Sequence, residues 1–113
     1  MNSNEFIEIR WSSGSIDEAR KVSRYLVQER LVACAQIIPW IESIYMWNNQ
    51  LETTQETKVV LKAKHADYDK IKSVIIENSK YEIPEITFIH IDGGNKEYLE
   101  WLKESTQELA KNS

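Results

Sequence analysis

The sequence predicts a small α+β domain built on a β-α-β-β-α-β order with an added C-terminal helix. Segments with alternating apolar residues, which are typical of strands, and segments with helical apolar spacing follow one another in that order. This is the ferredoxin-like plan. Right-handed crossovers place the first and third strands in the centre of an antiparallel sheet, which gives the strand order 4-1-3-2. A length of 113 residues fits one domain over 1–113, with an ordered core over about 5–110.

The first strand and helix are predicted from local patterns. Residues 6–11 alternate, and Gly14 ends that strand. Residues 15–18 have the form of a capping box, in which the Ser15 hydroxyl accepts from the amide three residues on and Glu18 reaches back to the Ser15 amide. The helix that follows is expected to end near residues 29–31.

A long hairpin over Val32–Lys64, with its tip at residues 48–54, is the most apolar part of the chain. Pro39 cannot donate a ladder hydrogen bond, so its strand is expected at a sheet edge. Beyond Pro39 both faces of the strand are apolar, and an apolar edge is an aggregation hazard unless something covers it. We therefore predict assembly with further copies of the chain, through the interface residues Trp40, Ile44, Tyr45 and Trp47.

The second half of the chain is predicted to contain two helices and one strand. A helix is expected over residues 66–79, followed by a loop and a strand over 83–91. Asn95 is expected to cap a last helix over residues 96–110, whose apolar stripe reaches Leu109.

Composition excludes several classes of function. The net charge is −4 and the isoelectric point is near 5.2, whereas a nucleic-acid-binding protein usually has a basic face. No apolar run approaches the length needed to span a bilayer, so no membrane association is expected. The single cysteine, Cys34, cannot form an intrachain disulfide, which favours a reducing compartment and a cytoplasmic location.

Few residues suggest catalysis or metal binding. Cys34 lies in an apolar strand and is interpreted as a small buried side chain. His65 and His90 are far apart in the sequence and lack metal-ligand spacing, so each is predicted to be a surface residue at a strand end. A metal site that pairs one of them with a carboxylate is the less favoured alternative. No nucleophile, base and orienting group occur in a recognisable order. We predict no enzyme activity, no metal ligands and no cofactor.

One polar and aromatic cluster is a candidate ligand site. Glu82 and Glu85 flank a proline beside a strand start, where they could bind a hard cation or act in acid–base chemistry, although anchoring of the loop is favoured. If a small-molecule pocket exists, it is expected between subunits, near Tyr45 and Trp47. Its predicted ligand-binding residues are Tyr81, Glu82, Glu85 and Lys62.

The chain resembles the CutA family of divalent-cation tolerance proteins over about residues 6–105. The matching motifs are residues 31–39 (LVACAQIIP), residues 43–47 (SIYMW), and residues 81–86 (YEIPEI) followed by Gly94 and residues 98–102 (YLEWL). The resemblance implies a ferredoxin-like subunit in a homotrimer, similar in plan to the PII signalling proteins. It also implies a non-catalytic role in the response to divalent metal ions, with weak metal binding. The alternative is a PII-like regulatory trimer that binds a small molecule in an intersubunit pocket.

In the family member with a copper site, the ligands are a cysteine in the first strand and histidines just before the Pro-Tyr of the later loop. Trp11, Asn78 and Ser79 occupy the matching positions here, and Lys80 replaces the loop proline. Copper and zinc favour thiolate and imidazole ligands. The resemblance therefore carries no copper ligands over to this chain.

Overall fold

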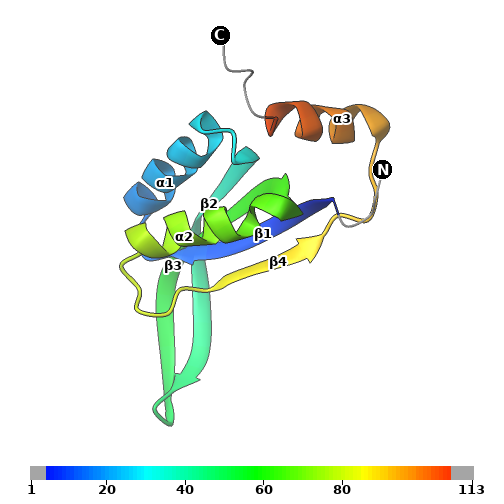
Figure 1. The fold of residues 1–113 in the computed structure, drawn as a ribbon. Coiled ribbons are helices and arrows are strands. Elements are labelled where there is room, and N and C mark those ends of the chain that lie inside the picture. The colour runs from blue at the N-terminus through cyan, green and yellow to red at the C-terminus, as the bar shows by residue number, and fades with distance from the viewer. Residues whose placement is uncertain (1–4, 108–113) are drawn as a thin grey trace.

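The computed structural model describes residues 5–107 and shows a mixed α+β domain. The four strands form one antiparallel sheet in the order β2-β3-β1-β4. Helices α1 and α2 cover one face of this sheet, and α3 lies across one end of it (Figure 1). The predicted α+β class and the predicted four-stranded antiparallel sheet are thereby confirmed. The elements are β1 (Phe6–Ser13), α1 (Ile16–Gln28), β2 (Val32–Trp47), β3 (Gln50–Lys64), the 3₁₀ turn η1 (His65–Asp67), α2 (Tyr68–Asn78), β4 (Ile86–His90) and α3 (Lys96–Ser105).

The main core lies between the sheet and helices α1 and α2. Successive strand residues point to opposite faces, so every second residue of β1 and β3 faces the helices. Ile9 and Leu61 are paired across the two central strands and are completely buried. Leu26 of α1 and Ile75 of α2 complete the layer. A second, smaller cluster around Phe6 and Leu102 attaches α3 to the other face of the sheet.

The start of α1 differs from the predicted capping box. The Ser15 hydroxyl accepts from the Glu18 amide at 3.1 Å, as predicted. The Glu18 carboxylate does not return to the Ser15 amide, because the Ser13 hydroxyl accepts from that amide at 3.3 Å. Glu18 instead accepts from the Ser13 hydroxyl at 2.6 Å and from the Lys80 amide at 2.9 Å. One buried carboxylate thus joins β1, α1 and the loop before β4.

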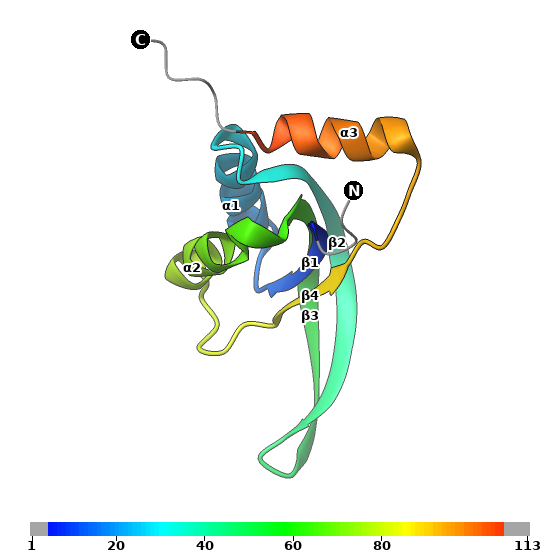
Figure 2. The same ribbon diagram turned by 45° about the vertical axis from the view of Figure 1, so that its right-hand side comes forward.

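The β2–β3 hairpin projects far beyond the body of the domain (Figure 2). Its strands pair as far as Trp47 and Gln50, so the tip is only Asn48 and Asn49, with φ angles of 51° and 64°. These angles fit a two-residue turn of type I′. The predicted tip over residues 48–54 was too long, because residues 50–55 continue the ladder with β2. The radius of gyration of 15.4 Å exceeds the roughly 13 Å typical of a compact domain of this size.

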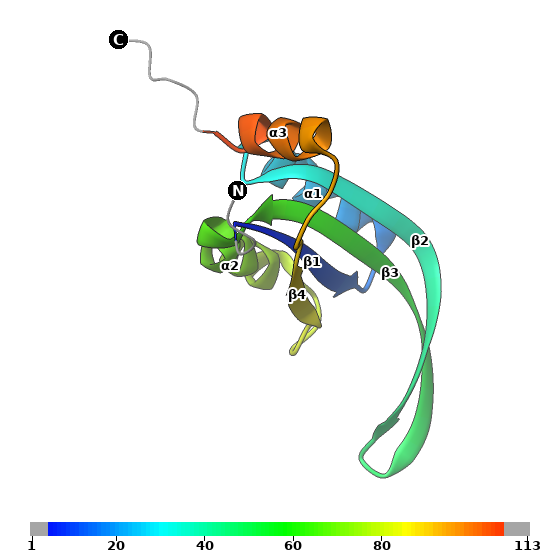
Figure 3. The same ribbon diagram turned by 90° about the vertical axis from the view of Figure 1, so that its right-hand side faces the viewer.

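Pro39 lies where the pairing of β2 with β3 is irregular, between Ile38 and Ile41. Because β2 is at the sheet edge, the missing amide hydrogen costs little there. Figure 3 shows both long strands, β2 and β3, curving along their length toward the tip of the hairpin.

The second half of the chain required smaller corrections. β4 begins at Ile86 and not at residue 83, and the first contact with β1 is the Ser12 amide donating to the Glu85 carbonyl at 3.2 Å. A 3₁₀ turn precedes α2. Asn95 lies at the N-cap of α3, but its side chain makes no capping hydrogen bond. The predicted residues 108–110, including Leu109, lie outside the described residues. Within residues 5–107, no helix is long and apolar enough to cross a membrane.

Candidate functional site

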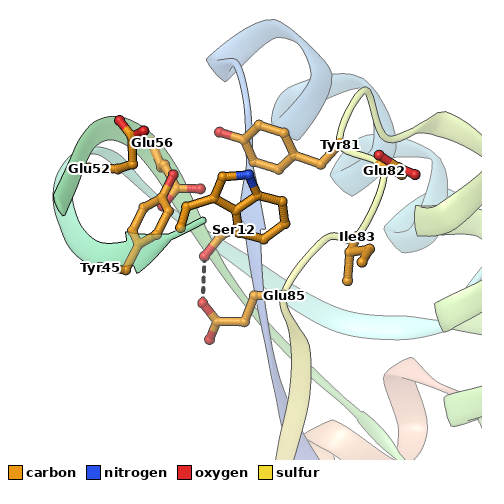
Figure 4. Close-up of a pocket in the computed structure, with 9 residues that line it drawn as sticks. Ser12, Tyr45, Glu52, Glu56, Tyr81, Glu82, Ile83 and Glu85 are labelled. Carbon is orange, nitrogen blue, oxygen red and sulfur yellow. Dashed lines mark hydrogen bonds between the residues drawn. The ribbon is translucent and has the colours of Figure 1, made fainter. Parts of the chain in front are cut away.

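A cleft of about 390 Å³ lies between the hairpin and the loop that precedes β4. Tyr45, Glu52 and Glu56 come from the hairpin, and Tyr81 to Ile83 with Glu85 come from the loop (Figure 4). Ser12 of β1 lies between the two sides, and Trp47 also contributes to the lining. Aromatic and carboxylate side chains therefore dominate the cleft.

The hairpin side of the cleft follows from strand geometry. Tyr45 and Trp47 are two residues apart on β2, so their side chains point to the same face. Glu52 is the cross-strand partner of Tyr45, and Glu56 is four residues further along β3. The pairing of β2 with β3 thus places two carboxylates beside two aromatic rings.

Tyr81 forms the loop side of the cleft. Its ring lies against Gly14, where an added Cβ would be 3.3 Å from two ring carbons, so a larger residue at position 14 would displace the ring. Burial raises the pKa of the Tyr81 phenol above its ordinary value, and the neighbouring Glu56 carboxylate raises it further. The phenol is therefore protonated at neutral pH and available as a hydrogen-bond donor.

Glu85 is tied to the protein framework. Its carboxylate accepts from the Ser12 hydroxyl at 2.8 Å and forms an ion pair with Lys58 at 3.1 Å. Burial alone would raise the pKa of Glu85, but the hydrogen bonds from Ser12 and Lys58 and the charges of Lys58 and Arg10 lower it overall. This geometry matches the anchoring role that the sequence favoured for this carboxylate.

The structure brings together three of the four predicted ligand-binding residues. Tyr81, Glu82 and Glu85 line the cleft, but Lys62 does not lie near them as expected. The Lys62 ammonium is 3.4 Å from the Tyr98 hydroxyl of α3 and 5.5 Å from the centre of that ring. Lys58, four residues earlier on the same face of β3, makes the contact with Glu85 instead.

Sequence reasoning missed Ser12, Glu52, Glu56 and Lys58. The pairing of Ser12 with Lys58 depends on the register between β1 and β3, which no local pattern specifies. The two glutamates could have been found from the hairpin, because its two-residue turn fixes which residues face Tyr45 and Trp47.

The predicted interface residues are all on the surface of the chain. Trp40, Ile44, Tyr45 and Trp47 are between 41% and 63% exposed, and Met46 and Leu51 beside them are also exposed. A single apolar residue on a surface is normal, but this many exposed apolar residues on one hairpin, on both faces of β2, are typical of an interaction surface. Tyr45 and Trp47 belong to both this surface and the cleft.

The residues at the copper-ligand positions of the CutA family do not fit a copper site. Trp11 is completely buried in the core. The Asn78 amide donates to the Val74 carbonyl, and the Ser79 hydroxyl accepts from the Tyr81 amide. In the described part of the chain, no three residues of the types His, Cys, Asp and Glu are grouped so that they could hold a metal ion.

The two histidines are exposed and lie at strand ends, as predicted. Their ring centres are 5.1 Å from each other. His65 follows β3 and His90 ends β4, and both strands pair with β1. Two residues that are distant in the sequence are therefore close in space.

An antiparallel four-stranded sheet with a projecting hairpin and three helices is the architecture of solved CutA1 proteins. The crystal structure of CutA1 from Oryza sativa superposes with a TM-score of 0.88 at 31% identity, covering 95% of this chain and 98% of that one. The family profile described as CutA1 divalent ion tolerance protein matches residues 9–105. This chain belongs to the CutA1 family.

Two relatives show how far the similarity extends. The divalent-cation tolerance protein CutA of Thermus thermophilus is 38% identical over 81% of this chain and 89% of its own length. The chloroplastic protein CutA 1 of Oryza sativa is 35% identical over 81% of this chain. The match spans only 52% of that rice protein, so this chain corresponds to about half of it.

Proposed function

We propose that the chain is a non-catalytic homotrimer that takes part in the response to divalent metal ions. The metal response is suggested by the name of the family, and the trimer by the resemblance to it. The observation that carries the proposal is the exposed apolar surface of the hairpin, because it requires a partner. The serine and carboxylate hydrogen bonds around the cleft go to other protein groups, which is typical of a fixed framework and not of an activated nucleophile.

A further copy of the chain is the partner that best fits the hairpin. Ile44 is 63% exposed near the end of an edge strand, which also presents unpaired backbone groups. Each square ångström of apolar surface removed from water stabilises an assembly by about 25 cal/mol. A closed ring of copies covers this surface on every subunit, whereas a monomer leaves it in water.

The oligomeric state tests this proposal. Light scattering during gel filtration is expected to give three times the 13.3 kDa chain mass. Ile44→Lys is expected to shift the protein toward the monomer, because a charge in an apolar interface loses its hydration. Ile76→Lys is the matched control, since Ile76 is exposed on the outer side of α2. A wild-type protein that stays monomeric at all concentrations would contradict the proposal.

The alternative function is a regulator of the PII kind that binds a small molecule in the cleft. The observation that favours it is an open cleft with three aromatic rings and four carboxylates. Among these four carboxylates, Glu85 is the one whose charge is neutralised by an ion pair with Lys58. Aromatic faces and carboxylates both attract positive charge, so this lining favours an organic cation over an anion.

Binding measurements test the alternative. Calorimetry is expected to show binding of 1,4-diaminobutane and no binding of ATP. Glu56→Gln is expected to weaken binding of the cation by about tenfold, which corresponds to the loss of one charge-assisted contact of about 1.4 kcal/mol. Glu97→Gln on α3 is the control, because it has the same chemistry outside the cleft. Failure of every cation to bind would reject the alternative and would leave the trimer proposal unaffected.

The cellular location is also part of the proposal. Cys34 is a free thiol in the described structure, which suits a reducing compartment such as the cytoplasm. The rice relative is named as chloroplastic, so location differs within the family. Fractionation of the native cells would test this point.

A further inference from the structure

We propose that His65 and His90 form a two-histidine site for a divalent transition metal, with Cu²⁺ bound most tightly and Zn²⁺ and Ni²⁺ more weakly. The biological meaning of this site rests on the proposed metal response. The two histidines are distinct from the positions that match the family's copper ligands, which are Trp11, Asn78 and Ser79 in this chain.

The backbone holds both histidines at one end of the sheet. Ile7 of β1 is paired with Ala63 on one side and with His90 on the other. His65 lies two residues beyond Ala63, where its amide donates to the Glu5 carbonyl at 2.8 Å. β3 and β4 are both neighbours of β1, so their backbones are about 10 Å apart. Side chains from these two positions can therefore meet over the start of β1.

The rings do meet, and a third ring supports them. The His65 and His90 ring centres are 5.1 Å apart, with their planes at 90°. The centre of the Phe88 ring lies 5.3 Å from the centre of the His65 ring and 5.5 Å from that of His90. The ring centre of Tyr68, in α2, lies 4.6 Å from that of Phe88. Phe88 and Tyr68 limit the rings on one side, while both histidines are exposed to solvent on the other. An ion can therefore reach them without any opening of the fold.

The spacing of the two rings suits one metal ion. Zinc binds histidine nitrogen at about 2.0–2.1 Å, so two imidazoles on one tetrahedral ion have ring centres roughly 5 Å apart. Rotation of the exposed rings about their side-chain bonds would turn a nitrogen of each toward the shared position. Imidazole suits zinc, copper and nickel, and the Irving–Williams order makes copper the tightest of these ions. Magnesium and calcium prefer oxygen ligands and are not expected here.

The site has two protein ligands and open positions. No third histidine, cysteine or carboxylate groups with the pair in residues 5–107. Water then fills the remaining positions, and binding is expected to be weaker than at a closed four-ligand site. A weak, accessible site releases and rebinds its ion readily, which suits a response to changing metal levels.

The experiment uses the full-length, untagged chain, because its two histidines are then the only imidazoles in the sample. Copper titration by calorimetry is expected to show one Cu²⁺ bound per chain, and electron paramagnetic resonance is expected to show two coordinated imidazole nitrogens. Addition of a small fraction of Cu²⁺ is expected to broaden both imidazole signals in the nuclear magnetic resonance spectrum. No broadening, or coordination by one imidazole only, would overturn the proposal.

Variants separate metal binding from aromatic packing. His65→Asn and His90→Asn are each expected to weaken Cu²⁺ binding by at least about tenfold. Cys34→Ser is the matched control and is expected to bind Cu²⁺ as the wild type does, because the thiol is not part of the site. Unchanged Cu²⁺ binding in both histidine variants would mean that the rings only pack together. That result leaves the trimer proposal standing, since light scattering tests it separately.

Discussion

Replacement of Glu18 by alanine is expected to lower the free energy of unfolding by about 2–4 kcal/mol. The Glu18 side chain is only 8% exposed, and its carboxylate accepts from the Ser13 hydroxyl and the Lys80 amide. Alanine leaves both donors without this partner at a site that water reaches poorly. Without this hydrogen bond, the loop that carries Tyr81 is expected to become more mobile, because Lys80 comes directly before Tyr81 in the chain. Urea unfolding measures the stability, and hydrogen exchange of the Lys80 amide measures the loop.

Two further substitutions make this test specific. Asp17→Ala changes the neighbouring exposed acid in the same helical turn and is expected to cost less than about 1 kcal/mol, through the helix dipole alone. Glu18→Gln keeps an oxygen that can accept from the Lys80 amide. Its loss of unfolding free energy is therefore expected to lie between those of Asp17→Ala and Glu18→Ala. If Glu18→Ala and Asp17→Ala lower the free energy of unfolding by the same amount, the Glu18 carboxylate does not hold the loop to the helix.

Replacement of Ile75 by alanine is expected to lower the free energy of unfolding by about 2–5 kcal/mol. Ile75 is completely buried between α2 and the sheet, so the smaller side chain leaves a cavity and loses its apolar transfer energy. The measurement is urea unfolding at one fixed protein concentration, because assembly makes apparent stability depend on concentration.

The next residue of the helix provides the control. Ile76 is 52% exposed, and Ile76→Ala is expected to cost less than about 1 kcal/mol because little apolar area leaves the interior. The two variants remove the same atoms from neighbouring positions. Equal losses of stability would mean that Ile76 is also covered, which would place α2 in a subunit interface.

Local patterns were enough to predict most elements of the fold. β2 was predicted over Val32–Trp47, as observed, because its length and apolar content are properties of the segment itself. The positive φ angles at Asn48 and Asn49 agree with the predicted turn, since asparagine tolerates that conformation. The strand start predicted at residue 83 was wrong, because the end of a strand depends on where a neighbour begins to pair.

The candidate site was predicted only in part. Tyr81, Glu82 and Glu85 are close in sequence and were identified as one cluster. Lys62 was assigned to that cluster in error, because lysines 58 and 62 are indistinguishable in the alternating pattern of their strand. The register of β1 against β3 decides that Lys58, paired with Ser12, reaches Glu85.

Residue types and their spacing within a segment were enough to predict the α+β class and the apolar hairpin, and to see that the family's copper ligands are missing at the matching positions. The contact of Glu18 with the Lys80 amide, the approach of the hairpin to Tyr81 and the meeting of His65 with His90 became visible only in the folded chain. Each of these contacts joins residues that are distant in sequence, and their distance is set by strand pairing and packing across the whole sheet. No local pattern contains that information.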